Sequence, residues 1–290
     1  MSYSVDELAT HPGMLGVIQL LASQLRGQYD ENPRLSRYMV SHQRWLMSQA
    51  AFALHLEFEA GISQEGLTTS RLRDMITSIN AASRNTVLNF LDQLLSYKFI
   101  AVATESNKRP RRFEATEITT QAMAGWVGAN LAALDQLDNG ERLMTFMAHP
   151  EMLCLLQPRI ARQCIDNLVW RNPPDCIAMF QWTESGGLVM DELMCRVDPD
   201  KRNEEKIDLG RIDARLIAEN FMMSRTHLQR LLRKAVLANC LEWHDDTRKT
   251  HMYIKRGFLS EYLGWQAEKF AIISEAFEWS LAQVEKLTCA

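Results

Sequence analysis

The stretch that decides the fold runs from Leu72 to Val102 and reads LRDMITSINAASRNTVLNFLDQLLSYKFIAV. Its first part has apolar residues at helical spacing, and Asn-Ala-Ala at 80–82 then predicts a short turn. Ser83 is a favourable N-cap because its hydroxyl accepts a hydrogen bond from a backbone amide that a helix leaves unpaired. The stretch therefore predicts a helix, a short turn and a second helix, with a strand from Ile100.

The chain repeats this pattern in its second half. Three short matches recur in the same order, at offsets of 138, 141 and 139 residues: His11–Leu15 with His149–Leu153, Ser83-Arg84 with Ser224-Arg225, and Gly125-Trp126 with Gly264-Trp265. The apolar face of the helix after the serine is kept in both copies. It consists of Val87, Phe90, Leu91, Leu94 and Leu95 in the first copy and of Leu228, Leu231, Leu232, Ala235 and Val236 in the second. Repetition at one period predicts an internal duplication.

The remaining elements follow from proline positions and periodicity. Proline suits a first helical position, so helices should begin at Pro12 and Pro150. A long helix is expected over 36–59, and its counterpart over 160–182 should break at Pro173-Pro174. Further expectations are a polar loop over 198–208, first-hairpin strands over 100–103 and 113–118, a shorter second hairpin, and last helices over 119–137 and 259–287.

A helix, a short turn, a helix and a basic-tipped hairpin form the order of a winged helix-turn-helix. The segment 72–102, Leu67-Thr68 before it, and Lys108-Arg109-Pro110-Arg111-Arg112 leading into Ile118-Thr119 resemble the MarR family of bacterial transcription regulators. The resemblance is fainter over 212–256. Such families usually place glycine just before the first wing strand, where a helix ends in a left-handed residue, whereas this chain has Lys98 and Asn239.

The resemblance implies a fold that is mainly α with small β-hairpin wings. We expect two tandem winged helix-turn-helix units with flanking helices, related by a pseudo-two-fold axis, since MarR-like proteins are normally homodimers of single units. A turn signal at 138–140 sets the boundary. The first unit is 1–138, with its helix-turn-helix at about 68–98 and its wing at about 100–118. The second is 139–290, with these parts at about 210–239 and 241–256.

The resemblance also implies sequence-specific binding of double-stranded DNA. A recognition helix lies in the major groove, where the side chains at its start reach base edges. The wings would contact phosphates or the minor groove. The DNA-binding residues expected in the first copy are Ser83, Arg84, Asn85, Thr86, Asn89, Lys108, Arg109, Arg111 and Arg112, and those in the second copy are Ser224, Arg225, Thr226, His227, Arg230, Arg233, Arg248 and Lys249. Because the copies differ, the preferred site should be asymmetric, with unlike half-sites about one helical turn apart.

Composition limits this interpretation. The 290 residues carry a formal net charge of −4, so DNA binding must come from local basic patches. No apolar run is long enough for a membrane span, and no secretory signal is recognisable. The six cysteines form no CxxC pair, which favours reduced thiols and a cytoplasmic protein.

No catalytic motif is present, so we expect a protein that is not an enzyme and that has no cofactor and no metal site. His244, Asp245, Asp246 and His251 cluster in the second hairpin, where a polar tip is favoured over metal ligation. Two alternatives remain open: a winged-helix interaction scaffold of the chromosome-organising type, which suits an acidic chain, and a plasmid-type replication initiator. A small-molecule effector also remains open, as does the choice between a monomeric pseudo-dimer and a homodimer.

Overall fold

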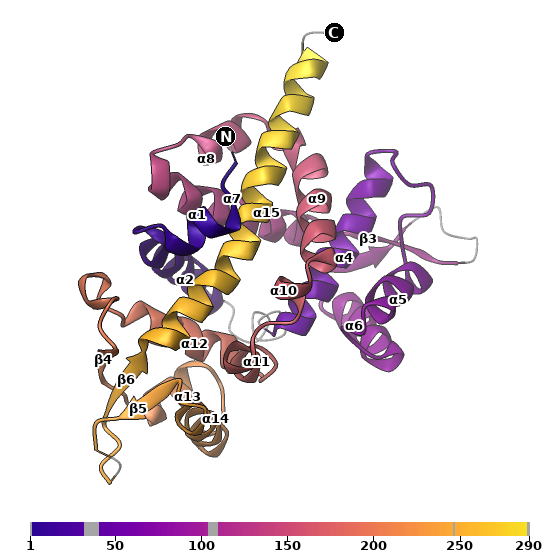
Figure 1. Cartoon of the computed structure of the whole chain (residues 1–290). Coiled ribbons are helices and arrows are strands. Elements are labelled where there is room, and N and C mark those ends of the chain that lie inside the picture. The colour runs from indigo at the N-terminus through magenta and orange to yellow at the C-terminus, as the bar shows by residue number, and fades with distance from the viewer. Residues whose placement is uncertain (1, 32–40, 104–109, 246, 289–290) are drawn as a thin grey trace. The chain divides into compact units, whose positions relative to one another are not determined.

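The computed structural model describes residues 2–31, 41–103, 110–245 and 247–288 (Figure 1). Most of these residues are helical, and the strands form two small antiparallel sheets of three strands each. The expectation of a mainly α fold with small β-hairpins is confirmed at this level. Within the described ranges, no helix combines the length and the apolar character that crossing a membrane requires.

Contacts divide the chain into two compact units. Unit 1 comprises residues 1–3, 43–171 and 271–290, and unit 2 comprises residues 4–42 and 172–270. These units do not coincide with the halves expected from the boundary at 138/139, because the helices before residue 43 belong to unit 2 and residues 139–171 belong to unit 1. The sequence does not indicate that residues 4–42 pack with the second half or that residues 139–171 pack with the first, since an apolar helix face can pack against either half.

Unit 1 holds the first hairpin and the helices around it. Its elements are α4 (His42–Glu59), β1 (Leu67–Thr68), α5 (Thr69–Ser78), α6 (Arg84–Ser96), β2 (Ile100–Val102), β3 (Arg112–Ala115), α7 (Glu117–Asp138), α8 (Arg142–Ala148), the 3₁₀ helix η1 (Pro150–Met152), α9 (Leu153–Asp166), α10 (Leu168–Arg171) and the end of α15 (Arg256–Thr288).

Unit 2 holds the second hairpin. Its elements are α1 (Val5–Thr10), α2 (Met14–Glu31), α11 (Asp175–Gln181), α12 (Gly186–Cys195), the 3₁₀ helix η2 (Pro199–Lys201), β4 (Lys206–Arg211), α13 (Ala214–Asn220), α14 (Arg225–Leu237), β5 (Leu241–Trp243), β6 (His251–Lys255) and the first part of α15. In both units a short strand precedes two helices, and two further strands follow them.

The two sheets have the same topology. Their strand orders are β1-β3-β2 and β4-β6-β5, and every pair is antiparallel. Ile100 pairs with Ala115 in one hairpin, and Leu241 pairs with Ile254 in the other. The second hairpin is thus two residues shorter, as its sequence predicts.

Helices α6 and α14 match in length and at both ends. Each has 13 residues and begins after a serine N-cap, Ser83 or Ser224. Beyond each helix, Lys98 and Asn239 have left-handed φ angles of 59° and 58°. The following amide donates back to the helix in both cases, from Phe99 N to Leu94 O at 2.8 Å and from Cys240 N to Ala235 O at 2.9 Å. Both residues therefore adopt the conformation for which glycine is the usual choice.

The inner faces of these helices form part of each core. The members are almost fully buried: Val87, Phe90, Leu91 and Leu94 in unit 1, and Leu228, Leu231, Leu232 and Ala235 in unit 2. Burying one large aliphatic or aromatic side chain of this kind contributes about 1.5–3 kcal/mol. The outer faces are consequently fixed toward solvent, which positions the candidate site.

Several expected element bounds are corrected. The loop expected over 198–208 contains η2 and the start of β4, because Ile207 and Leu209 alternate into the core against β6. Ile118 lies in α7 instead of a strand, and Arg256 begins α15. The helix expected from Pro12 begins at Met14, whereas Pro150 does begin η1.

The expected break at Pro173-Pro174 is confirmed, since α10 ends at Arg171 and α11 begins at Asp175. The expected helix over 36–59 is described from His42 onward as α4.

Candidate nucleic-acid interface

The exposed side of α14 is polar and cationic. Ser224 Oγ accepts a hydrogen bond from His227 N at 3.1 Å, which fixes the start of the helix. Because the apolar residues face inward, the expected site residues on this helix point to solvent. Those that are exposed are Ser224, Arg225, Thr226, His227, Arg230 and Arg233, together with Lys234.

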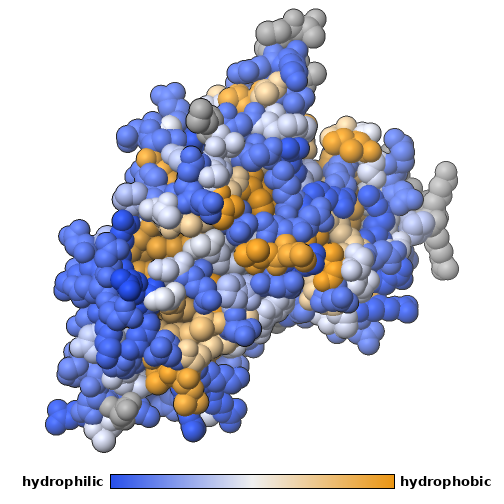
Figure 2. Space-filling view, viewed as in Figure 1, coloured by the Kyte–Doolittle hydropathy of each residue, from blue (hydrophilic) through white to orange (hydrophobic). Residues whose placement is uncertain are grey.

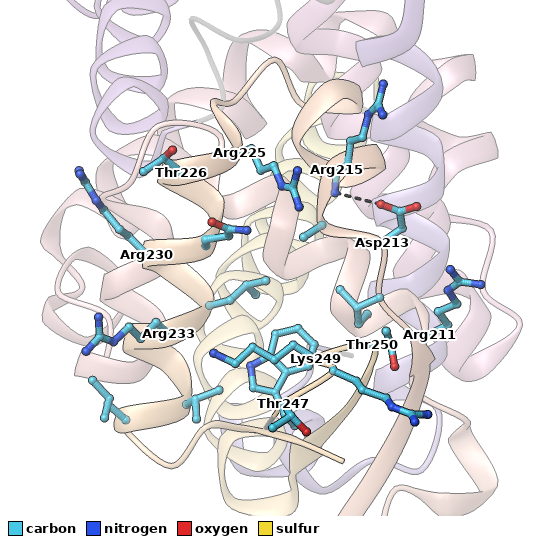
Figure 3. A pocket seen from close by; sticks show the side chains of 18 residues that line it. Arg211, Asp213, Arg215, Arg225, Thr226, Arg230, Arg233, Thr247, Lys249 and Thr250 are labelled. Atoms are coloured by element: carbon cyan, nitrogen blue, oxygen red, sulfur yellow. Dashed lines mark hydrogen bonds between the residues drawn. The ribbon is translucent and has the colours of Figure 1, made fainter. Parts of the chain in front are cut away.

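A groove of about 710 Å³ lies in unit 2 beside this helix (Figure 3). Residues of α13, α14, β5 and the turn at 247–250 line it. Seven lining residues are cationic: Arg211, Arg215, Arg225, Arg230, Arg233, Arg248 and Lys249. Among the described lining residues, Asp213 alone is acidic, so the groove is strongly electropositive.

The cations around the groove point in different directions, and not all of them point into it (Figure 3). Arg225 points toward the start of α13, where Arg215 and Asp213 lie (Figure 3). Arg230 and Arg233 extend from the other side of α14, and Arg211 lies at the end of β4. This spread suits an extended ligand with several negative charges better than one small anion.

Asp213, the one acidic residue among the described lining residues, already accepts hydrogen bonds from backbone amides. Asp213 N-caps α13, and its carboxylate accepts hydrogen bonds from Leu216 N at 3.1 Å and Arg215 N at 3.0 Å. The hydrogen bonds from these backbone amides, that of Leu216 above all, hold the pKa of Asp213 below its usual value. This carboxylate therefore stays ionised and stabilises α13, and it cancels only a small part of the groove's positive charge.

Among the described residues, most of the groove cations form no ion pair. Arg215 pairs with Glu219 at 2.8 Å, and Arg248 lies 3.9 Å from Asp245. In the part of the chain that the structure describes, no ion pair involves the other five groove cations, Arg211, Arg225, Arg230, Arg233 and Lys249. These five charges, which form no ion pair with a described residue, are available to a ligand.

The second hairpin adds a polar tip to the groove. His244 Nδ1 lies 3.0 Å from Tyr253 Oη across the hairpin, and Asp245 accepts a hydrogen bond from Thr247 N. Asp246 lies outside the described residues. Within the described ranges, no group of three or more ligating side chains could hold a metal ion.

The matching helix in unit 1 has a different surface. Ser83 Oγ accepts a hydrogen bond from Thr86 N at 3.2 Å. Arg84, Asn85 and Asn89 are exposed as expected, and Thr86 is half-buried. Asp92, a residue that the sequence analysis left out, is exposed on the same helix and opposes the charge of Arg84. This face can donate hydrogen bonds, but its charge is close to neutral.

The first hairpin supplies fewer cations than expected. Arg112 is half-buried, with its guanidinium 4.1 Å from the ring centre of Phe58 and ion pairs to Glu59 and Glu114. Gly66, at φ +67°, lies beside it, and a Cβ there would sit 2.9 Å from Arg112 Cδ. Arg112 therefore packs the hairpin against α4.

Arg111 is exposed, so the structure leaves it available as the sequence predicts. Lys108 and Arg109 lie outside the described residues.

Comparison with family models, with curated proteins and with solved structures gave no match for this chain.

Sequence reasoning missed three groove residues, Arg211, Arg215 and Gln229. Gln229 lies one turn beyond Arg225 on the exposed side of α14 and could have been found from helical periodicity. Arg211 and Arg215 flank Asp213 in what the sequence suggested was the entry to a helix. Their contribution depends on β4 ending beside the hairpin, which periodicity in so polar a segment does not reveal.

Proposed function

We propose that this chain is a transcription regulator that binds double-stranded DNA sequence-specifically through two winged helix-turn-helix units. The observation that supports this proposal best is the groove beside α14, with seven cations and one engaged acid. A DNA backbone carries one phosphate charge about every 1.7 Å of duplex length, so a spread of cations matches it well. The resemblance to MarR-like regulators points to the same partner.

In this proposal α14 enters the major groove. Its exposed start presents Arg225 and Thr226 to base edges, and arginine can donate two parallel hydrogen bonds to guanine. Arg248 and Lys249 on the hairpin contact the backbone, as does Arg211. Backbone contacts set the position of the helix, and base contacts select the sequence.

Helix α6 is the second proposed recognition helix. Arg84, Asn85 and Asn89 are exposed along its first turns, and asparagine can form two hydrogen bonds with adenine. The residues at matching positions of α14 differ, so the two recognition helices prefer different bases. The bound site should therefore be asymmetric.

A protein-interaction scaffold is the main competing proposal. Such a module needs an exposed apolar surface or paired charges at its interface. Among the described residues, the arginines on the face of α14 form no ion pair, which favours a polyanion over a typical protein surface. The net charge of −4 does not oppose this, because charges farther away than about 8–10 Å are screened at physiological salt.

Selection from a random double-stranded library tests the proposal. Purified full-length protein is incubated with the library, bound duplexes are amplified through several rounds, and the products are sequenced. We expect enrichment of one asymmetric motif. Fluorescence anisotropy should then give a selected duplex an affinity at least 10³-fold above that of a scrambled duplex.

Two variants with the same loss of charge provide the control. Arg225→Ala removes a proposed base contact, and Lys201→Ala removes an exposed cation of η2 outside the groove. Arg225→Ala should weaken binding of the selected duplex about 5- to 100-fold, while Lys201→Ala should leave it unchanged. No enrichment, with no duplex retained even at low salt, would refute the proposed function.

A further inference from the structure

The two proposed recognition helices, α6 and α14, differ in charge at matching positions. Helices α6 and α14 have equal length and begin at Arg84 and Arg225, so each residue of one has a counterpart 141 residues later. Three pairs of counterparts carry the difference: Asn89 with Arg230, Asp92 with Arg233, and the half-buried Gln93 with the exposed Lys234. The arginine at the start of each helix is shared.

The charge of the two faces follows directly. The face of α14 carries Arg225, Arg230, Arg233 and Lys234, all exposed. At the same positions α6 has one arginine, one aspartate and two amides, so its formal charge cancels. A phosphate close to Asp92 would be repelled, whereas one close to Arg233 would be attracted.

The sheets extend this difference beyond the helices. In unit 2 the last residue of β4 is the exposed Arg211, paired in register with the exposed His251. The corresponding pair in unit 1 is Thr68 with Arg112. Thr68 is buried and caps α5, and Arg112 is held by Phe58 and two glutamates. Unit 1 thus has no cation at the position of Arg211, and its cation at the position of His251, Arg112, is already paired.

We infer that the unit 2 groove makes most of the phosphate contacts and that the α6 face makes few. The groove of unit 2 then serves as the anchoring face, which supplies most of the electrostatic affinity, whereas the α6 face has Arg84 as its one cation among the four compared positions and acts mainly through hydrogen bonds. This inference rests on the proposed function, because it assigns unequal roles to the two proposed recognition helices.

Salt dependence separates the two roles. Each phosphate contact releases condensed counterions, so the slope of log K against log salt concentration changes by about 0.9 per contact. A side chain that only hydrogen-bonds a base leaves this slope unchanged. The slope therefore counts the contacts that each face contributes.

Two double variants at matching positions form the test. Arg230→Ala with Arg233→Ala alters the anchoring face, and Asn89→Ala with Asp92→Ala alters the same positions of α6. All four residues are exposed, so both variants should keep the wild-type thermal unfolding midpoint, which circular dichroism checks. Anisotropy titrations of a labelled 30-base-pair duplex between 50 and 300 mM NaCl then give affinities and slopes (about 30 base pairs cover such a site).

The α14 variant should bind at least tenfold more weakly at 150 mM salt and lose about 2 from its slope. The α6 variant should keep the wild-type slope, and any affinity that it loses with the Asn89 hydrogen bonds should be lost equally at every salt concentration. An equal loss of slope in both variants, or no loss of slope in the α14 variant, would overturn the inference while the proposed function stands. A wild-type protein that binds no duplex would instead refute the proposed function, and the inference with it.

Discussion

Arg233 in α14 and Asp92 in α6 occupy the same place in two helices of equal length, and they carry opposite charges on exposed surfaces. The apolar positions behind them are kept, so the two helices share a packing role. Their outer faces differ in charge. Figure 2 shows that hydrophilic side chains cover much of the visible surface, so charge has to be compared residue by residue at matching positions.

Charge reversal at this position is the first prediction. Arg233→Asp gives α14 the residue of α6 and adds repulsion to the loss of a contact. Duplex affinity at 100 mM salt should fall at least tenfold, which corresponds to about 1.4 kcal/mol. Anisotropy measures the change, and Lys201→Asp, the same reversal in η2, should have little effect. A loss below twofold would show that no phosphate lies near Arg233.

The left-handed residue after α6 predicts a gain in stability. Lys98 has a φ of 59°, which costs energy for a residue with a Cβ. Lys98→Gly should raise the free energy of unfolding by about 0.5–1 kcal/mol. Asn239→Gly should gain less because asparagine tolerates this conformation. Urea unfolding followed by circular dichroism checks both, and a destabilised Lys98→Gly variant would contradict the explanation.

An ion network around the buried Arg142 ties α7 to α8, with Asp135 half-buried and Asp138 exposed. Arg142 donates to both carboxylate oxygens of Asp138, at 2.8 and 2.6 Å, and to Asp135 at 3.0 Å. The hydrogen bond from Arg142 lowers the pKa of Asp138 to about 2. Since Asp138 is held ionised in the folded state, its contribution is full above about pH 4 and is lost as the pH falls toward 2.

Removal of this arginine should therefore destabilise unit 1. Arg142→Ala leaves Asp135 and Asp138 without their shared cation and should cost about 2–3 kcal/mol at pH 7. Arg142→Lys should recover only part, because an ammonium cannot match both oxygens of Asp138. Urea unfolding at pH 7 and pH 2.5 measures the effect, which should be smaller at the lower pH. Equal stability of all three proteins would refute the network's role.

A half-buried acid in unit 2, Asp191, predicts the opposite pH dependence. Asp191 accepts a hydrogen bond from the buried Tyr262 at 3.0 Å, and burial raises the pKa of Asp191 to about 6. Its unfolded pKa is about 3.9, so its folded state favours the proton. Stability from this group is full below about pH 4 and is lost as the pH rises through 6.

Neutralising this residue should remove that loss. Asp191→Asn keeps an acceptor for Tyr262 and should stabilise the protein by about 1–2 kcal/mol at pH 7.5, with the gain shrinking toward pH 4. Urea midpoints across pH 4–8 measure it, and the exposed Asp200→Asn serves as the control. A gain that does not depend on pH would contradict the assignment to ionisation.

The sequence predicted the local features well. Ser83 and Ser224 cap the expected helices, and the second hairpin is shorter by two residues. The residues predicted to face inward are buried except for Leu95 and Val236, which are half-buried. These features depend on neighbours within a few turns of the chain. The left-handed conformation expected before each first hairpin strand is present at both Lys98 and Asn239.

Features that depend on distant contacts could not be predicted. From the sequence, Arg112 is expected to be a wing cation available to DNA. In the structure it lies over the ring of Phe58 and pairs with Glu59, and neither residue is near it in sequence. From the sequence, Arg211 is expected at the start of the helix-turn-helix at about 210–239. In the structure it ends β4 and lies at the edge of the groove. The exchange of helices between the compact units is of the same kind, because helix amphipathicity does not specify a partner.

The central claim is that a DNA duplex lies in the groove beside α14, and site-specific photo-cross-linking tests it most directly. A photoreactive p-benzoylphenylalanine replaces Gln229 inside the groove or, as a control, the exposed Met144 of α8. Under conditions where both proteins bind a labelled selected duplex, irradiation should cross-link DNA to position 229 and give no adduct above background at position 144. Bound duplex with no adduct at 229, or with equal yields at the two positions, would contradict the account.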